Sequence, residues 1–157
     1  MSDFNPENIK YLDVNTVNFA AESPIHDGRY LQFEDIRRYS FEIGYQLELN
    51  AAEGIVRILL QVGIKGHMKG SSRKPKLGKL TTESFFYLED YADWIVEEFD
   101  EDGEPTAKLH ELMNAILLGL AFSTTRGILT IRSLDTLLEG FILPVVAPQK
   151  LRQFQIE

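Results

Sequence analysis

The chain has 157 residues, of which 44% are hydrophobic and 25% are charged, and it contains no cysteine. This length fits one domain, so residues 1–157 are treated as a single domain that buries an ordinary core. The lack of cysteine excludes disulfides, thiolate metal sites and a cysteine nucleophile. Sixteen basic and 24 acidic residues leave a net charge of −8. Because nucleic-acid binding normally needs a net basic face, we expect no nucleic-acid partner.

No uninterrupted apolar run reaches the ~18 residues that a membrane span needs. The first ten residues also lack the basic and then apolar pattern of a signal peptide. The sequence therefore predicts a cytoplasmic protein without a membrane span.

The first predicted strand covers residues 9–19, with Tyr11, Val17 and Phe19 as candidate core side chains. A proline and an Asp–Gly pair then predict a loop. The next pattern is the clearest in the chain. From Tyr39 every second residue up to position 49 is apolar, and the residues between are polar or glycine.

Residues 56–64 repeat this alternation after a short turn at 50–54. A period of two with one polar face is typical of an antiparallel strand that is covered on one side. We therefore predict a hairpin over residues 39–64. A third extended segment, rich in threonine and aromatic residues, follows at 80–91.

Charge is unevenly distributed after this hairpin. Residues 65–79 hold six of the sixteen basic residues and no acidic one, whereas residues 83–104 hold ten carboxylates and no lysine or arginine. The basic segment does not match a phosphate-binding loop, and a solvated connection paired with the acidic block is the simpler interpretation. The acidic block lacks the ligand alternation of a calcium loop, so we expect a solvated surface that attracts a basic protein partner.

The helical predictions begin at residues 91–99, where a short amphipathic helix is favoured over a continuing strand. A long helix is predicted over 107–125, with Thr106 as its N-cap and Gly127 just beyond its end. An extended arm and a short helix from Pro148 complete the chain. This order predicts an α+β fold, a four-stranded antiparallel sheet followed by a long helix, an extended arm and a short C-terminal helix.

Catalytic and metal-binding motifs are missing from the sequence. His26, His67 and His110 lack the spacing of a metal site, and the Ser-Thr-Thr-Arg-Gly segment at 123–127 is not a nucleophile motif. No glycine-rich dinucleotide fingerprint is present. We therefore expect no enzyme, no catalytic residue, no metal and no cofactor.

Apolar residues are more abundant than one sheet and two helices can cover. The chain has 10 Phe, 6 Tyr and 1 Trp. Core packing explains any single one of them, but together they indicate an oligomer interface or a groove for extended peptides. The candidate peptide-binding residues are Phe85, Tyr87, Trp94, Phe141, Leu143 and Val145.

Several segments resemble the SecB-like family of bacterial export chaperones. The opening IKYLDVNTVNFAAESP resembles the first strand of that family, and the hairpin over 39–64 resembles its central strands. The predicted helix 107–125, the arm to Pro144 and the helix from Pro148 are similar to its C-terminal part. The resemblance covers about residues 9–152. The LRQFQIE ending lacks the basic, metal-binding tail through which the export chaperone meets the SecA motor, and the 69–79 and 123–127 segments depart from the family pattern.

This resemblance implies an ATP-independent chaperone that holds unfolded or extended polypeptide in apolar grooves. The client is left open, because SecB-like proteins serve export or dedicated toxin–antitoxin partners. An alternative is an interaction module of the same fold that binds one specific protein. SecB-like proteins are dimers that pair into tetramers, so a homodimer or homotetramer is expected.

Overall fold

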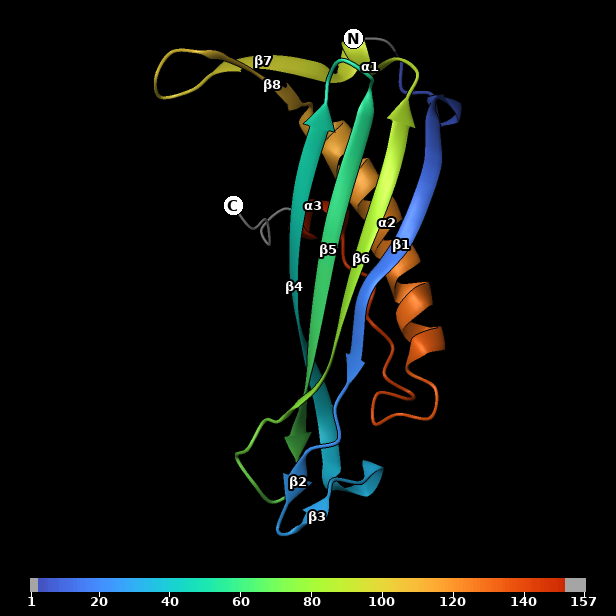
Figure 1. Ribbon diagram of the computed structural model, residues 1–157, viewed down its shortest axis with the longest axis vertical. Coiled ribbons are helices and arrows are strands. Elements are labelled where there is room, and N and C mark those ends of the chain that lie inside the picture. Colours follow the sequence, from blue (N-terminus) through green and yellow to red (C-terminus); the bar gives the residue numbers. More distant parts are fainter. Residues whose placement is uncertain (1–2, 152–157) are drawn as a thin grey trace.

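The computed structural model describes residues 3–151 and shows a long, twisted antiparallel sheet with one long helix lying across one face (Figure 1). Its elements in chain order are the 3-10 turn η1 (Pro6–Asn8), β1 (Ile9–Ala21), β2 (Ile25–His26), β3 (Arg29–Tyr30), the 3-10 turn η2 (Phe33–Asp35), β4 (Ile36–Asn50), β5 (Ile55–Met68), β6 (Lys76–Leu88), α1 (Tyr91–Trp94), β7 (Ile95–Phe99), β8 (Pro105–Leu109), α2 (Glu111–Arg132) and α3 (Pro148–Leu151).

The main sheet has the strand order β1-β6-β5-β4, and every neighbouring pair is antiparallel. The predicted four-stranded sheet is confirmed. The β4–β5 hairpin turns at Gly54, where the backbone has a φ of +68° and a Cβ would lie 2.7 Å from the Tyr91 ring. Glycine is therefore needed at this turn for both conformation and space. β1 and β4 are the two edges of the sheet.

The alternation in β5 sorts its side chains between the two faces of the sheet. The inward side chains are at most 1% exposed, and they are Val56, Ile58, Leu60, Val62 and Ile64. They pack in one cluster with Leu117, Leu118 and Ala121 of α2. A period of two on the sheet and an apolar stripe on the helix thus produce one core on one side of the sheet. The opposite face, called the outer face below, has no helix against it (Figure 1).

The long helix begins later than the sequence suggested. Residues 105–109 form β8 and pair with β7, so the predicted N-cap at Thr106 is wrong. The N-cap is His110, whose Nδ1 accepts a hydrogen bond from the Leu112 amide at 3.1 Å. The prediction failed because the helical spacing of the apolar residues extends back to Leu109. This residue is buried, but as the last residue of β8 and not as part of the helix.

The same hairpin corrects the prediction for residues 91–99. Only Tyr91–Trp94 is helical, and the next five residues form β7, because they pair with β8 over their whole length. At the other end, α2 continues through Gly127 to Arg132, since Leu129 is buried against the core. The predicted helix end at Gly127 is therefore wrong.

Two of the three core residues predicted in β1 are exposed: Tyr11, which lies on the edge strand, and Val17. A strand irregularity explains the exposure of Val17. Val17 is 56% exposed, because the β1–β6 register shifts between Thr16 and Asn18. A bulge of this kind turns a side chain away from the face that simple alternation assigns to it. Phe19, beyond the shift, packs against the core as expected.

One buried polar link joins the sheet to the helix. Thr82 of β6 and Thr125 of α2 are fully buried, and their hydroxyl oxygens lie 2.8 Å apart. Thr125 donates its own proton to the Ala121 carbonyl at 2.8 Å, so Thr82 is the donor to Thr125. The chain of two hydrogen bonds satisfies both hydroxyls in the core.

We predict that Thr125→Val lowers the free energy of unfolding by about 1–3 kcal/mol, because the Thr82 hydroxyl is then buried without a partner. The double variant with Thr82→Val should be no less stable than the single one. Thr124→Val, which removes a bond from the exposed side of the helix, is the control and should have a smaller effect. Denaturant unfolding measures all three, and a double variant much less stable than Thr125→Val would contradict this account.

Candidate functional site

The largest of the hollows described here lies between the crossover segment that links β1 to β4 and the chain that follows α2. It has a volume of about 650 Å³. On one side are Tyr30, Leu31 and Phe33, and on the other are residues 135–139. Tyr30 is 63% exposed and Phe33 is 44% exposed. We call this hollow the crossover groove. An open hollow with aromatic rims suits an extended polypeptide better than a small, enclosed ligand.

An ion pair and a set of backbone contacts fix the shape of the crossover. Arg29 donates two hydrogen bonds to the carboxylate of Asp35, at 2.8 and 2.7 Å, and the Gln32 amide donates a third at 2.8 Å. The Asp35 carbonyl accepts a bond from the Lys69 amide, which ties the crossover to the β5–β6 connection. The aromatic rim of the groove is therefore presented on a braced segment, not a free loop.

These contacts lower the pKa of Asp35 to about 2, first through the Arg29 side-chain bonds and then through the Gln32 amide. Because the pKa of Asp35 is lowered, its ionised carboxylate stabilises the folded crossover at pH values above the ordinary carboxyl pKa of 3.8. This contribution disappears as the pH falls toward 2.

A second groove runs between α2 and the arm after it, with a volume of about 290 Å³. Its walls are mostly apolar and include Leu120, Val145 and Val146. Arg126 fixes the arm, because its Nε donates to the Leu143 carbonyl at 2.7 Å. We call this hollow the arm groove.

A third hollow, of about 520 Å³, lies on the outer face near the β4–β5 turn. Leu12, Ile55 and Phe85 supply its apolar surface. Arg57 also lines it and donates from Nε to Glu83 at 2.8 Å, a bond that raises the pKa of the guanidinium. This outer-face hollow therefore combines apolar contact with a fixed charged pair.

The structure distributes the six residues predicted from sequence over different sites. Phe85 and Tyr87 are half-buried on the outer face, whereas Val145 is 80% exposed in the arm groove. The other three, Trp94, Phe141 and Leu143, are buried in the core. The six residues do not line one common groove.

Two of the buried members, Phe141 and Leu143, support the walls of the grooves, whereas Trp94 lines none of the hollows described here. The Phe141 ring lies 5.3 Å from that of Tyr39, whose hydroxyl donates to the Leu137 carbonyl at 2.8 Å. Burial raises the pKa of Tyr39, which keeps this donor protonated. Trp94 packs edge-on against His110, with ring centroids 5.9 Å apart.

Sequence reasoning missed the aromatic residues of the crossover. Ile25 lies in the loop that the proline and the Asp–Gly pair predicted, and Tyr30 and Phe33 follow in residues for which no element was predicted. The available signal was three large apolar residues within a short segment without alternation. Such residues in a loop have no core to enter and indicate a surface contact.

Two further apolar surfaces remain uncovered. Edge strand β1 exposes Tyr11, Leu12, Val14 and Val17. The side of α2 away from the sheet exposes Leu112 and Ile131, and helical spacing places them on one stripe with Leu120, which also lines the arm groove. Within residues 3–151, α2 is the one helix long and apolar enough to cross a membrane by length and composition alone, and 44% of that stretch is buried against the protein.

The described part of the chain has no cluster of side chains suited to binding a metal ion. Residues 3–151 contain no group of three histidine, aspartate or glutamate side chains that could hold an ion. His67 shares a hydrogen bond with Ser40 at 2.9 Å, and its pKa is lowered, chiefly by desolvation and then by nearby arginine and lysine. The arrangement offers apolar and charged contact surfaces.

The strand order, the long helix on one face and the short C-terminal helix define a SecB-like fold. One solved structure that matches it is the SecB-like chaperone Rv1957 of Mycobacterium tuberculosis, in complex with a peptide from the antitoxin HigA1. The TM-score is 0.55, over 89% of this chain and 88% of that chain, with 8% sequence identity. No protein-family model and no curated protein matches the sequence.

We predict that Asp35→Asn loosens the crossover at neutral pH, since the neutral amide removes the ion pair with Arg29. Hydrogen exchange at the Gln32 and Lys69 amides should become faster, while the melting temperature changes little because the pair is at the surface. Glu34→Gln, a neighbouring exposed position, is the matched control. Unchanged exchange in the Asp35 variant would show that the ion pair does not brace the crossover.

Proposed function

We propose that this protein is an ATP-independent chaperone that binds unfolded or extended polypeptide in its apolar grooves. The observation that carries the proposal is the crossover groove, an open hollow of about 650 Å³ with Tyr30 and Phe33 exposed at its rim. Aromatic rings on a braced segment contribute a large contact area at little entropic cost. The fold is shared with a chaperone that was solved with a bound peptide, which supports the same assignment.

The arm groove and the outer-face hollow extend this surface. Val145 and Phe85 would contact the polypeptide directly, with Tyr87 beside Phe85. The buried Phe141 and Leu143 would act through the walls that they support, whereas the buried Trp94 packs against His110 away from the hollows. Several separate apolar hollows suit a long, extended chain that touches the surface at intervals.

The proposed assembly is a homodimer or a homotetramer. The uncovered stripe of α2 and the apolar edge strand β1 are the surfaces that a second copy would cover. An exposed edge also presents unpaired backbone groups that another strand can use. Burial of apolar area contributes about 25 cal/mol per Å², from which the cost of association is subtracted. We also propose a cytoplasmic location for this assembly.

We predict that the protein suppresses aggregation of reduced, unfolded clients at stoichiometric amounts. Replacing both Tyr30 and Phe33 by serine should weaken this suppression about tenfold, because two aromatic contacts are lost. Phe99→Ser removes a still more exposed aromatic outside the grooves and should leave suppression unchanged. If the unaltered protein suppresses no client and instead recovers one folded partner, it is a specific interaction module and not a chaperone.

We predict that light scattering at micromolar protein concentration will measure a mass of at least two chains. Ile131→Lys should lower this mass, because it places a charge on the uncovered stripe of α2. Ile25→Lys adds the same charge at an exposed apolar position of the crossover and serves as the control. A mass near 17.9 kDa for the unaltered protein, that of one chain, would contradict the assembly.

A further inference from the structure

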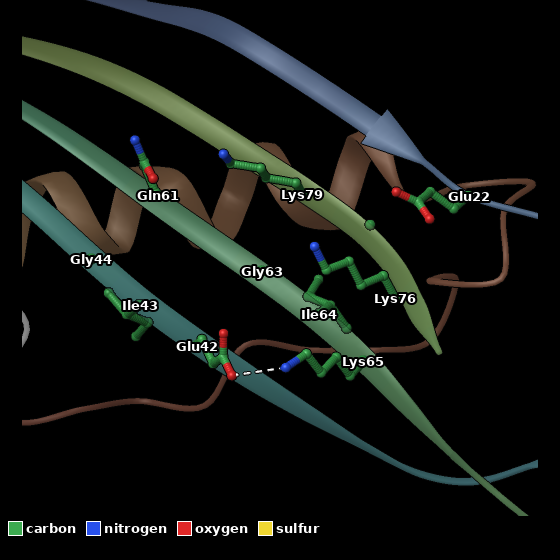
Figure 2. A pocket seen from close by; sticks show the side chains of 11 residues that line it. Glu22, Glu42, Ile43, Gly44, Gln61, Gly63, Ile64, Lys65, Lys76 and Lys79 are labelled. Atoms are coloured by element: carbon green, nitrogen blue, oxygen red, sulfur yellow. Dashed lines mark hydrogen bonds and ion pairs between the residues drawn. The ribbon is translucent and has the colours of Figure 1, made fainter. Parts of the chain in front are cut away.

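The outer face of the sheet carries a lysine basin, a hollow of about 390 Å³ (Figure 2). Gly44 and Gly63 leave part of its floor as bare backbone, and a Cβ at Gly63 would meet no atom within 4 Å. The ammonium groups that line the basin belong to Lys65, Lys76 and Lys79. The hollow is therefore open, shallow and basic.

The charges of the basin are only partly balanced within the chain. Lys65 lies 3.0 Å from a carboxylate oxygen of Glu42, and Glu22 also lines the rim. Among residues 3–151, no ion pair is formed by Lys76 or Lys79. An incoming group with several negative charges would find these two ammonium groups available.

The complementary charge lies on the tip of the β7–β8 hairpin. The exposed carboxylates of this acidic tip are Glu97, Glu98, Asp100, Glu101, Asp102 and Glu104. Asp100 orders the turn, because its Oδ1 accepts bonds from the Asp102 and Glu104 amides at 3.0 and 2.8 Å. The tip is thus a defined acidic turn that projects from the body of the molecule (Figure 1).

The sequence suggested that the basic segment 65–79 pairs with this acidic block, but within one chain it does not. The hairpin leaves the sheet near Leu88 at the end of β6, whereas Lys79 lies near the start of the same strand. Nine residues of strand separate these points by about 30 Å, and hairpin strands of five residues reach only about 17 Å. The acidic tip therefore cannot fill the basin of its own chain.

The hairpin also lacks a covering surface. Every residue of β7 and β8 except Ile95 and Leu109 is exposed. An isolated two-stranded hairpin is marginally stable in water, so a partner that covers this one would stabilise it. At physiological salt the screening length is about 8 Å, and the net charge of −8 on each copy does not prevent close opposite charges from pairing.

From these observations we propose that the acidic tip of one copy docks in the lysine basin of a second copy. If two copies are related by a two-fold axis, each supplies one tip and one basin. This contact is independent of polypeptide binding. It adds a salt-sensitive interface to the contacts proposed for the apolar surfaces of α2 and β1, whose strength does not depend on charge screening.

Charge reversal on the full-length protein tests the proposal, with mass measured by sedimentation at ~0.1 M and ~0.5 M salt. Lys76→Glu with Lys79→Glu reverses the basin, and Glu101→Lys with Asp102→Lys reverses the tip. Each double variant should raise the concentration for half-association about tenfold or more at low salt. An equimolar mixture of the two variants should associate like the unaltered protein, because both contacts between unlike chains are again complementary.

Two further variants make the result decisive. The chain with all four substitutions keeps its net charge and should recover self-association. Lys69→Glu with Lys74→Glu makes the same charge change in the basic loop outside the basin and should have a much smaller effect. The proposal is overturned if the reversed variants associate like the unaltered protein at low salt, if their mixture fails to recover association, or if the loop control weakens association equally.

Discussion

A single long helix covers only one face of a four-stranded sheet, and most features of this molecule follow from that constraint. The inward side chains of β5 are fully buried against α2, and this burial is the main source of stability. Apolar side chains elsewhere on the molecule are either exposed to solvent or must be covered by a second molecule. The outer face, the edge strand β1 and the far side of α2 are all left for contacts outside the chain.

The same constraint explains why the two grooves lie at the borders of the core. The crossover groove and the arm groove form where connecting segments place some side chains in the core, such as Leu31 and Leu143, and leave the others at its edge. Buried rings such as Phe141 hold these segments in place, while neighbouring side chains remain open to solvent. Apolar residues therefore have two roles here. The buried side chains hold the connecting segments in place, and the exposed ones remain available for contact.

The sequence was most informative where periodicity and burial agree. Alternation in β4 and β5 identified the hairpin and its buried face, because one covered side imposes a period of two. Helical spacing identified α2 but not its start, since Leu109 fits the helical stripe and is buried in β8 instead. The exposure of Val17 could not be predicted, because a bulge depends on tertiary contacts rather than on local pattern. The crossover aromatics carried a signal as apolar residues without alternation, but the ion pair that braces them did not.

The bond from Arg126 to the arm has a consequence for how this surface could change. Arg126 donates a hydrogen bond to the main-chain carbonyl oxygen of Leu143, and any residue at position 143 would have this acceptor. The path of the arm is therefore anchored without regard to the exposed side chains on either side, Ile142 and Val145. Substitutions at those two positions could alter the chemistry of the surface while its geometry stays the same, so the surface could diverge on an unchanged scaffold.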